Sequence, residues 1–129
     1  MVGIVLVSHS EDIANGIKEL SLQMAPDANL ALAGGTADGR LGTDANKIME
    51  AIESVYCEDG VIVLFDLGSA YMNTEMAIEF LDEDKQKNVE IIDAALVEGA
   101  ITAIVESSIG KSKEEIKKAL KNLELGKMP

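Results

Sequence analysis

The sequence predicts an α/β protein with one doubly wound sheet, mainly parallel, and helices on both faces of that sheet. Short runs of consecutive apolar residues alternate along the chain with segments in which apolar residues recur every three or four positions. The continuous runs are typical of strands that are buried on both faces, as in parallel sheets. A length of 129 residues suits one domain with a real hydrophobic core, so we expect a single domain over residues 1–129.

The first half of the chain contains two expected strands and two expected helices. Val2–Val7 predicts the first strand, and Leu30–Ala33 predicts a weaker second strand because alanine is a poor strand former. Between them, an apolar stripe predicts a helix that ends at Pro26. This stripe consists of Ile13, Ile17, Leu20 and Met24. After a glycine-rich loop over 34–42, Thr43 is expected to cap a second helix. The apolar residues of that helix are Ala45, Ile48, Ile52 and Val55.

The second half continues the alternation. Val61–Phe65 is the clearest buried strand of the chain, and Val89–Ile92 predicts a fourth strand. A third helix lies between them, and we expect its apolar stripe to face the core, as methionine stripes usually do. This stripe consists of Met72, Met76 and Phe80. A fourth helix is expected to end near Gly110. Its apolar residues are Val97, Ala100, Ile101, Ile104 and Val105.

The remaining segment predicts one more helix and completes the topology. Ser112 and Glu115 form a capping box, which opens a last amphipathic helix. Its apolar residues are Ile116, Leu120 and Leu123. Residues 126–129 are expected to be loose. Right-handed crossovers between parallel strands predict the strand order 2-1-3-4. Four strands leave exposed sheet edges, which a partner subunit often covers, so we expect a homodimer.

The two central strands of this order end next to reactive side chains. His9, the only histidine, follows the first strand, and Asp66 follows the third. Open α/β sheets bind ligands in the crevice outside the carboxyl ends of such strands. Adjacent strands lie about 5 Å apart, so the imidazole and the carboxylate are expected to meet. A histidine there can be a nucleophile, a base or a metal ligand. An aspartate on one ring nitrogen suits a nucleophile, because it leaves the other lone pair free and favours the positive charge that develops.

Three segments around this crevice carry groups that bind phosphate. Helix N-termini and glycine-rich turns present amide groups to anions. One predicted helix begins after His9, a second begins after Asp66, and the glycine-rich loop lies between them in sequence. The candidate phosphate-binding residues are Ser10, Gly35, Thr36, Gly42 and Ser69. A histidine, an orienting aspartate and these segments together indicate a phosphohistidine carrier.

Composition and motifs disfavour several other functions. A formal charge of −12 repels nucleic acids and anionic membranes. The single cysteine, Cys57, forms no intramolecular disulfide, and no segment reads as a signal peptide or a membrane span, so a cytoplasmic protein is expected. One histidine without CxxC or HxxxH spacing leaves no recognisable metal site. Neither Ser8 nor Ser69 lies in the G-x-S-x-G elbow of serine hydrolases.

With these residues the chain resembles the mannose-type enzyme IIA family of the bacterial phosphotransferase system, and within it the branch that serves phosphoenolpyruvate-dependent dihydroxyacetone kinase. The matching segments are 3–10, 34–43 and 65–75. The resemblance implies that His9 accepts a phosphoryl group from phospho-HPr and that Asp66 orients and stabilises the imidazole. The group would then pass to ADP on the nucleotide-binding subunit of the kinase. The resemblance also implies a homodimer that needs no cofactor or metal of its own.

Other readings share parts of this pattern. A sugar-transport enzyme IIA would pass the phosphoryl group to an enzyme IIB domain. Such proteins usually carry Gly-Gly-Ser-Pro after the aspartate, and the absence of that proline in 66–71 favours the dihydroxyacetone branch. A response-regulator-like domain would need an acidic pair at the end of the first strand, where Ser8-His9-Ser10 stands. A flavin protein would need aromatic shielding, and the chain has no Trp. A non-catalytic dimer module would not depend on His9.

Overall fold

The computed structural model describes residues 1–128 and contains a four-stranded sheet in the predicted order, β2-β1-β3-β4. All neighbouring strands are parallel. The strands are β1 (Gly3–Ser8), β2 (Leu30–Gly34), β3 (Val61–Phe65) and β4 (Val89–Ile91). The predicted α/β class and strand order are confirmed.

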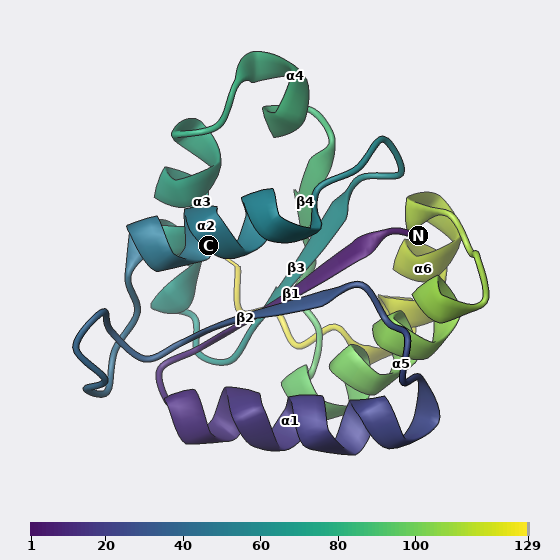
Figure 1. The fold of residues 1–129 in the computed structure, drawn as a ribbon, viewed down its shortest axis with the longest axis horizontal. Helices are drawn as coiled ribbons and strands as arrows, with labels where there is room; N and C mark the ends of the chain where they lie inside the picture. Colours follow the sequence, from purple (N-terminus) through teal and green to yellow (C-terminus); the bar gives the residue numbers. More distant parts are fainter. Residues whose placement is uncertain (129) are drawn as a thin grey trace.

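Helices cover both faces of the sheet (Figure 1). One face carries α1 (Glu11–Met24), α5 (Leu96–Ser108) and α6 (Lys113–Leu120). The other face carries α2 (Ala45–Val55) and α3 (Ala70–Glu79). Two short elements were not predicted: the helix α4 (Glu83–Gln86) and the 3₁₀ turn η1 (Lys121–Leu123).

The central strands β1 and β3 are buried along their whole length. Successive side chains of a strand point to opposite faces, so each strand contributes to two core clusters. In β1, Ile4 and Leu6 pack in the cluster under α1, α5 and α6, whereas Val5 and Val7 pack in the cluster under α2 and α3. The residues that follow β1 and β3 are therefore held by a rigid, fully packed frame.

The buried face of α1 differs from the prediction. Its buried residues are Ala14, Ile17 and Ser21. Of the predicted stripe only Ile17 is buried, and the exposed members are Ile13, Leu20 and Met24. The small side chains of the buried face allow the helix to lie close to the sheet, which places the larger apolar side chains at the flanks.

The same difference is found in α3. Its buried residues are Ala70, Thr74 and Ala77. The predicted core stripe is instead 72%, 47% and 53% exposed at Met72, Met76 and Phe80. The expectation that this stripe faces the core is wrong, and the three apolar side chains lie on the exposed side of α3 beside Glu75 and Glu79.

The helix caps agree with the sequence in one case and not in another. Asp44, not Thr43, caps α2, because its carboxylate accepts hydrogen bonds from two amides of the first turn. Thr43 instead accepts a hydrogen bond from Asn73 Nδ2 at 2.7 Å, which ties the start of α2 to α3. The capping box of Ser112 and Glu115 at the start of α6 is confirmed.

The C-terminal segment lies against the sheet, so the expectation of a loose tail is wrong for residues 126–128. Ala94 forms an antiparallel bridge with Glu124, and Lys127 is hydrogen bonded through both its amide and its side chain. In Figure 1 this segment, drawn in yellow, returns from the α6 side past the sheet. The expectation for Pro129 lies outside the described residues.

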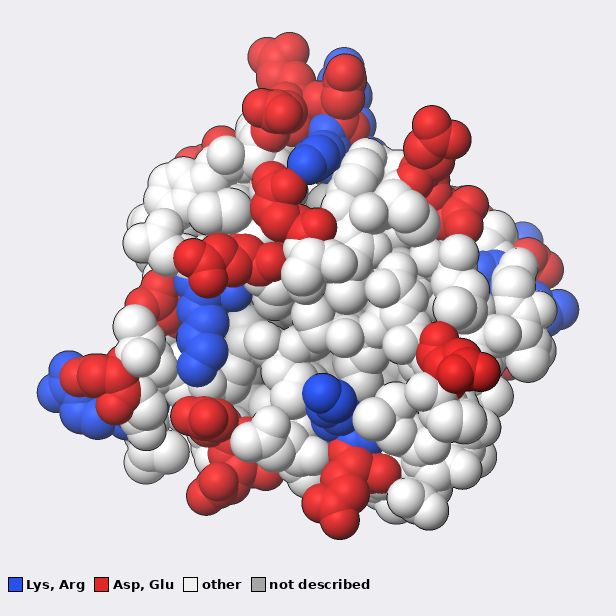
Figure 2. All heavy atoms as spheres, in the orientation of Figure 1, with Lys and Arg blue, Asp and Glu red and all other residues white. Residues whose placement is uncertain are grey.

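The surface is acidic at its margins. Figure 2 shows acidic side chains around the rim of one face and a largely uncharged centre, with few basic groups between them. Within residues 1–128, no helix is both long enough and apolar enough to cross a bilayer.

Candidate active site

The site forms where β1 and β3 end side by side. Val7 is in register with Phe65, so the residues after each of them leave the sheet at the same edge. His9 Nδ1 lies 2.9 Å from Asp66 Oδ1. The structure therefore brings together the two side chains that the sequence singled out, across the junction where open α/β sheets form ligand crevices.

The Asp66 carboxylate is surrounded by donors. Besides the imidazole, it accepts hydrogen bonds from the Ser8 hydroxyl (2.9 Å), the His9 amide (2.8 Å) and the Leu67 amide (2.6 Å). Burial by itself raises the pKa of this carboxyl, but the four donors hold the pKa below its usual value. The side chain is only 14% exposed. Asp66 is thus an ionised, fixed acceptor at neutral pH.

An ionised carboxylate determines the roles of both ring nitrogens of His9. Asp66 accepts only, so Nδ1 must carry the proton that lies between them. In the neutral ring the other nitrogen, Nε2, then has a free lone pair. Ser69 Oγ lies 2.9 Å from Nε2, and its hydroxyl donates to that lone pair. The imidazole is 26% exposed, so the ring is accessible from solvent.

Ser8 takes part in this arrangement, although it was not predicted as a site residue. Its hydroxyl donates to Asp66 and accepts from the Ser10 amide at 3.1 Å. The side chain is fully buried. Its position could have been used to predict this role. Ser8 ends a buried apolar strand directly before the candidate histidine, and a buried hydroxyl needs hydrogen-bond partners.

The glycine-rich loop adjoins the site, but its polar groups are engaged within the protein. The Gly35 amide donates to the Ser8 carbonyl, and the Gly42 amide donates to the His9 carbonyl. The Thr36 hydroxyl donates to Asp38 at 2.6 Å. Gly35 has φ +74°, a left-handed conformation that favours glycine. Gly35 and Gly42 thus hold the loop against the end of β1, whereas Thr36 forms its hydrogen bonds within the loop.

The helix starts on either side of His9 offer free donors. Ser10 caps α1 by accepting from an amide of its first turn, which leaves its hydroxyl hydrogen available. At the start of α3, the amides of Gly68 and Ser69 donate to no partner within residues 1–128. These groups and the Ser69 hydroxyl lie at helix N-termini, where anions are favoured.

Within the described part of the chain, no three His, Cys, Asp or Glu side chains are grouped so as to hold an ion.

Comparison with known proteins identifies similar sequences over most of the chain. The family model described as "PTS system fructose IIA component" matches residues 3–117. PEP-dependent dihydroxyacetone kinase 2, phosphoryl donor subunit DhaM, of Listeria innocua is 43% identical over 95% of this chain and 99% of its own length. The PTS-dependent dihydroxyacetone kinase, phosphotransferase subunit DhaM, of Lactococcus lactis is 39% identical over 94% of both chains. Escherichia coli DhaM is 40% identical, but this chain spans only 25% of it.

Solved structures share the fold. The crystal structure of the unknown-function protein EF1359 superposes with a TM-score of 0.83 at 36% identity, over 95% of this chain and 94% of the other. A sigma-54 interaction domain protein from Enterococcus faecalis matches with a TM-score of 0.69 at 18% identity, a likeness of fold alone.

Proposed function

This chain belongs to the mannose-type enzyme IIA family, described as the PTS system fructose IIA component, and we propose that His9 carries a phosphoryl group to a dihydroxyacetone kinase. The observation that carries the proposal is the hydrogen bond from Nδ1 of His9 to the ionised Asp66. It leaves Nε2 as the nucleophile. The printed names of the relatives, phosphoryl donor subunits of such kinases, support this role. In this proposal residues 1–129 form one phosphocarrier domain.

The first half-reaction loads His9. The Nε2 lone pair attacks the phosphorus of phospho-HPr, a bond from Nε2 to phosphorus forms, and the bond to the donor breaks with its electron pair returning to HPr. Asp66 balances the positive charge that develops on the ring. The Ser69 hydroxyl must leave the lone pair as the bond forms, and it is then placed to donate to a phosphoryl oxygen. Positioning and charge stabilisation supply the catalysis.

The second half-reaction unloads His9. A terminal oxygen of ADP, held by the nucleotide-binding kinase subunit, attacks the phosphorus, and the bond to Nε2 breaks with its electrons returning to the ring. We propose that the hydroxyls of Ser10 and Ser69 contact the phosphoryl oxygens in both steps. Both lie at helix N-termini; the Ser10 hydrogen is available, and the Ser69 hydrogen is released when Nε2 bonds to phosphorus. Gly35, Thr36 and Gly42 join them as phosphate ligands only if they release their present partners.

The acceptor is the feature that separates two functions. An enzyme IIA of sugar transport would load in the same way and would pass the group to an enzyme IIB domain. The names of the relatives favour the kinase. We propose a cytoplasmic protein with no cofactor and no metal, since Nε2 and the surrounding donors supply the chemistry.

We further propose a homodimer. The exposed stripe of Met72, Met76 and Phe80 is a candidate interface, because soluble monomers rarely expose contiguous apolar patches. A second candidate surface is β4, an edge strand with one side unpaired, which lines a groove together with α3.

The experiment for the carrier function is phosphorylation in a reconstituted chain. The parent and His9→Ala are incubated with phosphoenolpyruvate, enzyme I and HPr, and both are weighed by intact mass spectrometry. We expect one acid-labile phosphoryl group on the parent and none on the variant. An uncharged parent beside charged HPr would contradict the proposal.

Addition of an acceptor then distinguishes the two functions. The phosphorylated parent is mixed with the ADP-bound kinase subunit or, separately, with an enzyme IIB domain. Loss of the phosphoryl group to ADP alone is expected, and loss to the IIB domain alone would assign the protein to sugar transport.

A further inference from the structure

All three N–H groups of the Lys127 ammonium donate hydrogen bonds to main-chain carbonyls, at the end of the sheet where the site lies. Its Nζ donates to Phe65 O at 2.7 Å, to Asp66 O at 3.0 Å and to Ala94 O at 3.0 Å. Nζ also lies 4.5 Å from the centroid of the Phe65 ring, a distance at which a cation is attracted to an aromatic face. One side chain thus joins the end of β3 to the segment after β4.

Two of these three carbonyls flank the Cα of Asp66. The Phe65 carbonyl belongs to the peptide plane before Asp66, and the Asp66 carbonyl belongs to the plane after it. Each peptide unit is planar, so fixing both planes fixes the two soft backbone angles of Asp66. These angles set the direction in which the carboxylate leaves the backbone, toward His9 Nδ1.

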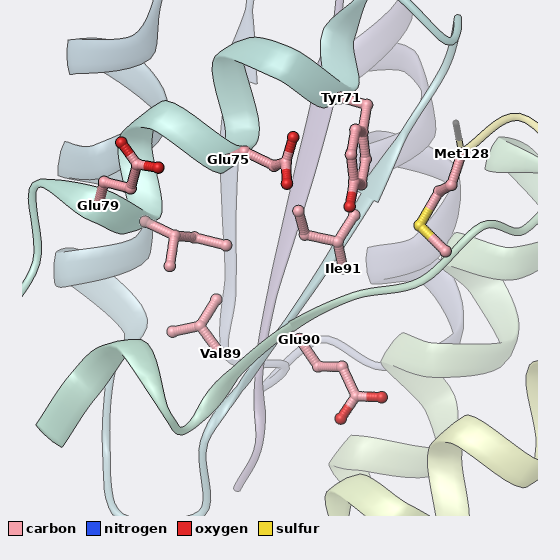
Figure 3. A pocket seen from close by; sticks show the side chains of 8 residues that line it. Tyr71, Glu75, Glu79, Val89, Glu90, Ile91 and Met128 are labelled. Atoms are coloured by element: carbon pink, nitrogen blue, oxygen red, sulfur yellow. The ribbon is translucent and has the colours of Figure 1, made fainter. Parts of the chain in front are cut away.

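The C-terminal segment is itself held in place beside the site. The Lys127 amide donates to Asp93 Oδ2 at 2.6 Å. The chain passes so close to Gly68 that a Cβ there would lie 3.1 Å from the Lys127 carbonyl oxygen. Met128 then closes one end of a groove of about 360 Å³ between α3 and β4, beside Tyr71 and Ile91 (Figure 3). The backbone that carries the Lys127 side chain is therefore fixed by contacts of its own, which hold the ammonium next to the end of β3.

Two opposing effects act on the pKa of the Lys127 ammonium. Burial lowers the pKa, and it outweighs the nearby carboxylates of Asp93 and Asp66, which raise it. A buried charge needs hydrogen bonds and opposite charge around it, and Lys127 has both.

We propose that Lys127 is a positioning residue for phosphoryl transfer, which holds the backbone of Asp66 so that its carboxylate keeps His9 in the Nδ1–H form. The inference rests on the proposed carrier function of His9 for its kinetic part only. Its structural part concerns the unphosphorylated protein and is measured separately.

The test uses the fact that His9 is the only histidine, so its ring nitrogens give one unambiguous set of ¹⁵N signals. The parent, Lys127→Met and Lys127→Arg are compared, with Lys18→Met as the matched control because Lys18 is exposed on α1. We expect the neutral ring of the parent and of Lys18→Met to be in the Nδ1–H form. Lys127→Met should shift the ring toward Nε2–H, and Lys127→Arg, which keeps a charged donor, should restore part of the parental signal.

Transfer from phospho-HPr gives the second measurement. We expect Lys127→Met to lower the rate of phosphoryl transfer about 10- to 100-fold at saturating donor, as misplacement of a reacting group does, with little change in KM. Lys127→Gln replaces Lys127→Met if the latter does not unfold cooperatively. Parental ¹⁵N signals in Lys127→Met, or in Lys127→Gln where it replaces that variant, would overturn the proposal. A parent that accepts no phosphoryl group would contradict the carrier function, and the ¹⁵N comparison would still decide the role of Lys127.

Discussion

At the scale of single residues, the site separates the two nitrogens of one imidazole into two roles. Nδ1 donates a hydrogen bond to Asp66, and Nε2 accepts a hydrogen bond from the Ser69 hydroxyl. The carboxylate is held by three further donors from Ser8, His9 and Leu67, so it neither rotates nor takes up a proton easily. The orientation of the His9 imidazole thus depends on a short stretch of backbone at the end of each central strand.

This arrangement predicts how Asp66 links stability to pH. Its pKa is lower in the folded protein than in the unfolded chain, so the unfolded chain binds the proton more readily. The stabilisation by Asp66 is fully present above the unfolded pKa, about 4, and is lost as the pH falls through the folded pKa. Asp66→Asn should lower the free energy of unfolding by about 1–3 kcal/mol at pH 7, and by less in acid. Urea unfolding at pH 7 and at pH 3 measures both differences.

Asp27→Asn is the control for this prediction, since Asp27 is exposed and has no hydrogen-bond partner within the described residues. The assignment fails if Asp66→Asn and Asp27→Asn show the same dependence on pH. It also fails if the difference between Asp66→Asn and the parent grows as the solution is acidified.

At the scale of elements, apolar periodicity identified the helices but not the side of α1 and α3 that packs. Both stripes of large residues were expected to face the core, and the structure instead buries smaller neighbours such as Ala14 and Ala77. Periodicity shows that a helix has an apolar side. It does not show how closely the helix approaches the sheet, which depends on the partner strand. At α1 the facing strand presents a glycine, and there the small Ala14 is buried while large residues lie at the flanks.

Gly34 at the end of β2 is that glycine, and it gives a prediction about the placement of α1. A Cβ at Gly34 would lie 2.9 Å from Ala14 Cβ and 2.9 Å from the Cα of Glu11, in the first turn of the helix that follows His9. Gly34→Ala should therefore lower the free energy of unfolding by about 1–3 kcal/mol, the range for overpacking. Thermal unfolding followed by circular dichroism measures the effect.

The matched control is the same substitution in α1 itself. A Cβ at Gly16 meets nothing within 4 Å, and the residue lies in the helix interior. Gly16→Ala should raise the free energy of unfolding by about 0.5–1 kcal/mol, because alanine is the better helix former. A stabilising Gly34→Ala would show that the helix moves away at little cost.

At the scale of the whole molecule, the topology and the location of the site follow from local sequence, while the long-range supports do not. Buried apolar runs and right-handed crossovers were enough to predict that His9 and Asp66 lie next to each other. Lys127 contacts carbonyls more than thirty residues away in sequence. Every residue has a main-chain carbonyl, so the residue type does not show which one accepts a hydrogen bond. The tail was for that reason expected to be loose. Contacts between a side chain and a distant backbone are the class of interaction that sequence patterns cannot reveal.

The same scale includes the proposed homodimer, for which the exposed side of α3 makes a definite prediction. Met76→Glu places a charge in the middle of the apolar stripe without disfavouring the helix, because glutamate is a good helix former. In a two-fold interface the charge is introduced twice and is buried without a partner, so dissociation is expected. Met24→Glu, at a 62% exposed position on α1 across the sheet, should leave the dimer intact. Sedimentation velocity of the parent and both variants measures the masses. A monomeric parent would exclude the dimer, and dissociation by Met24→Glu alone would place the interface on α1.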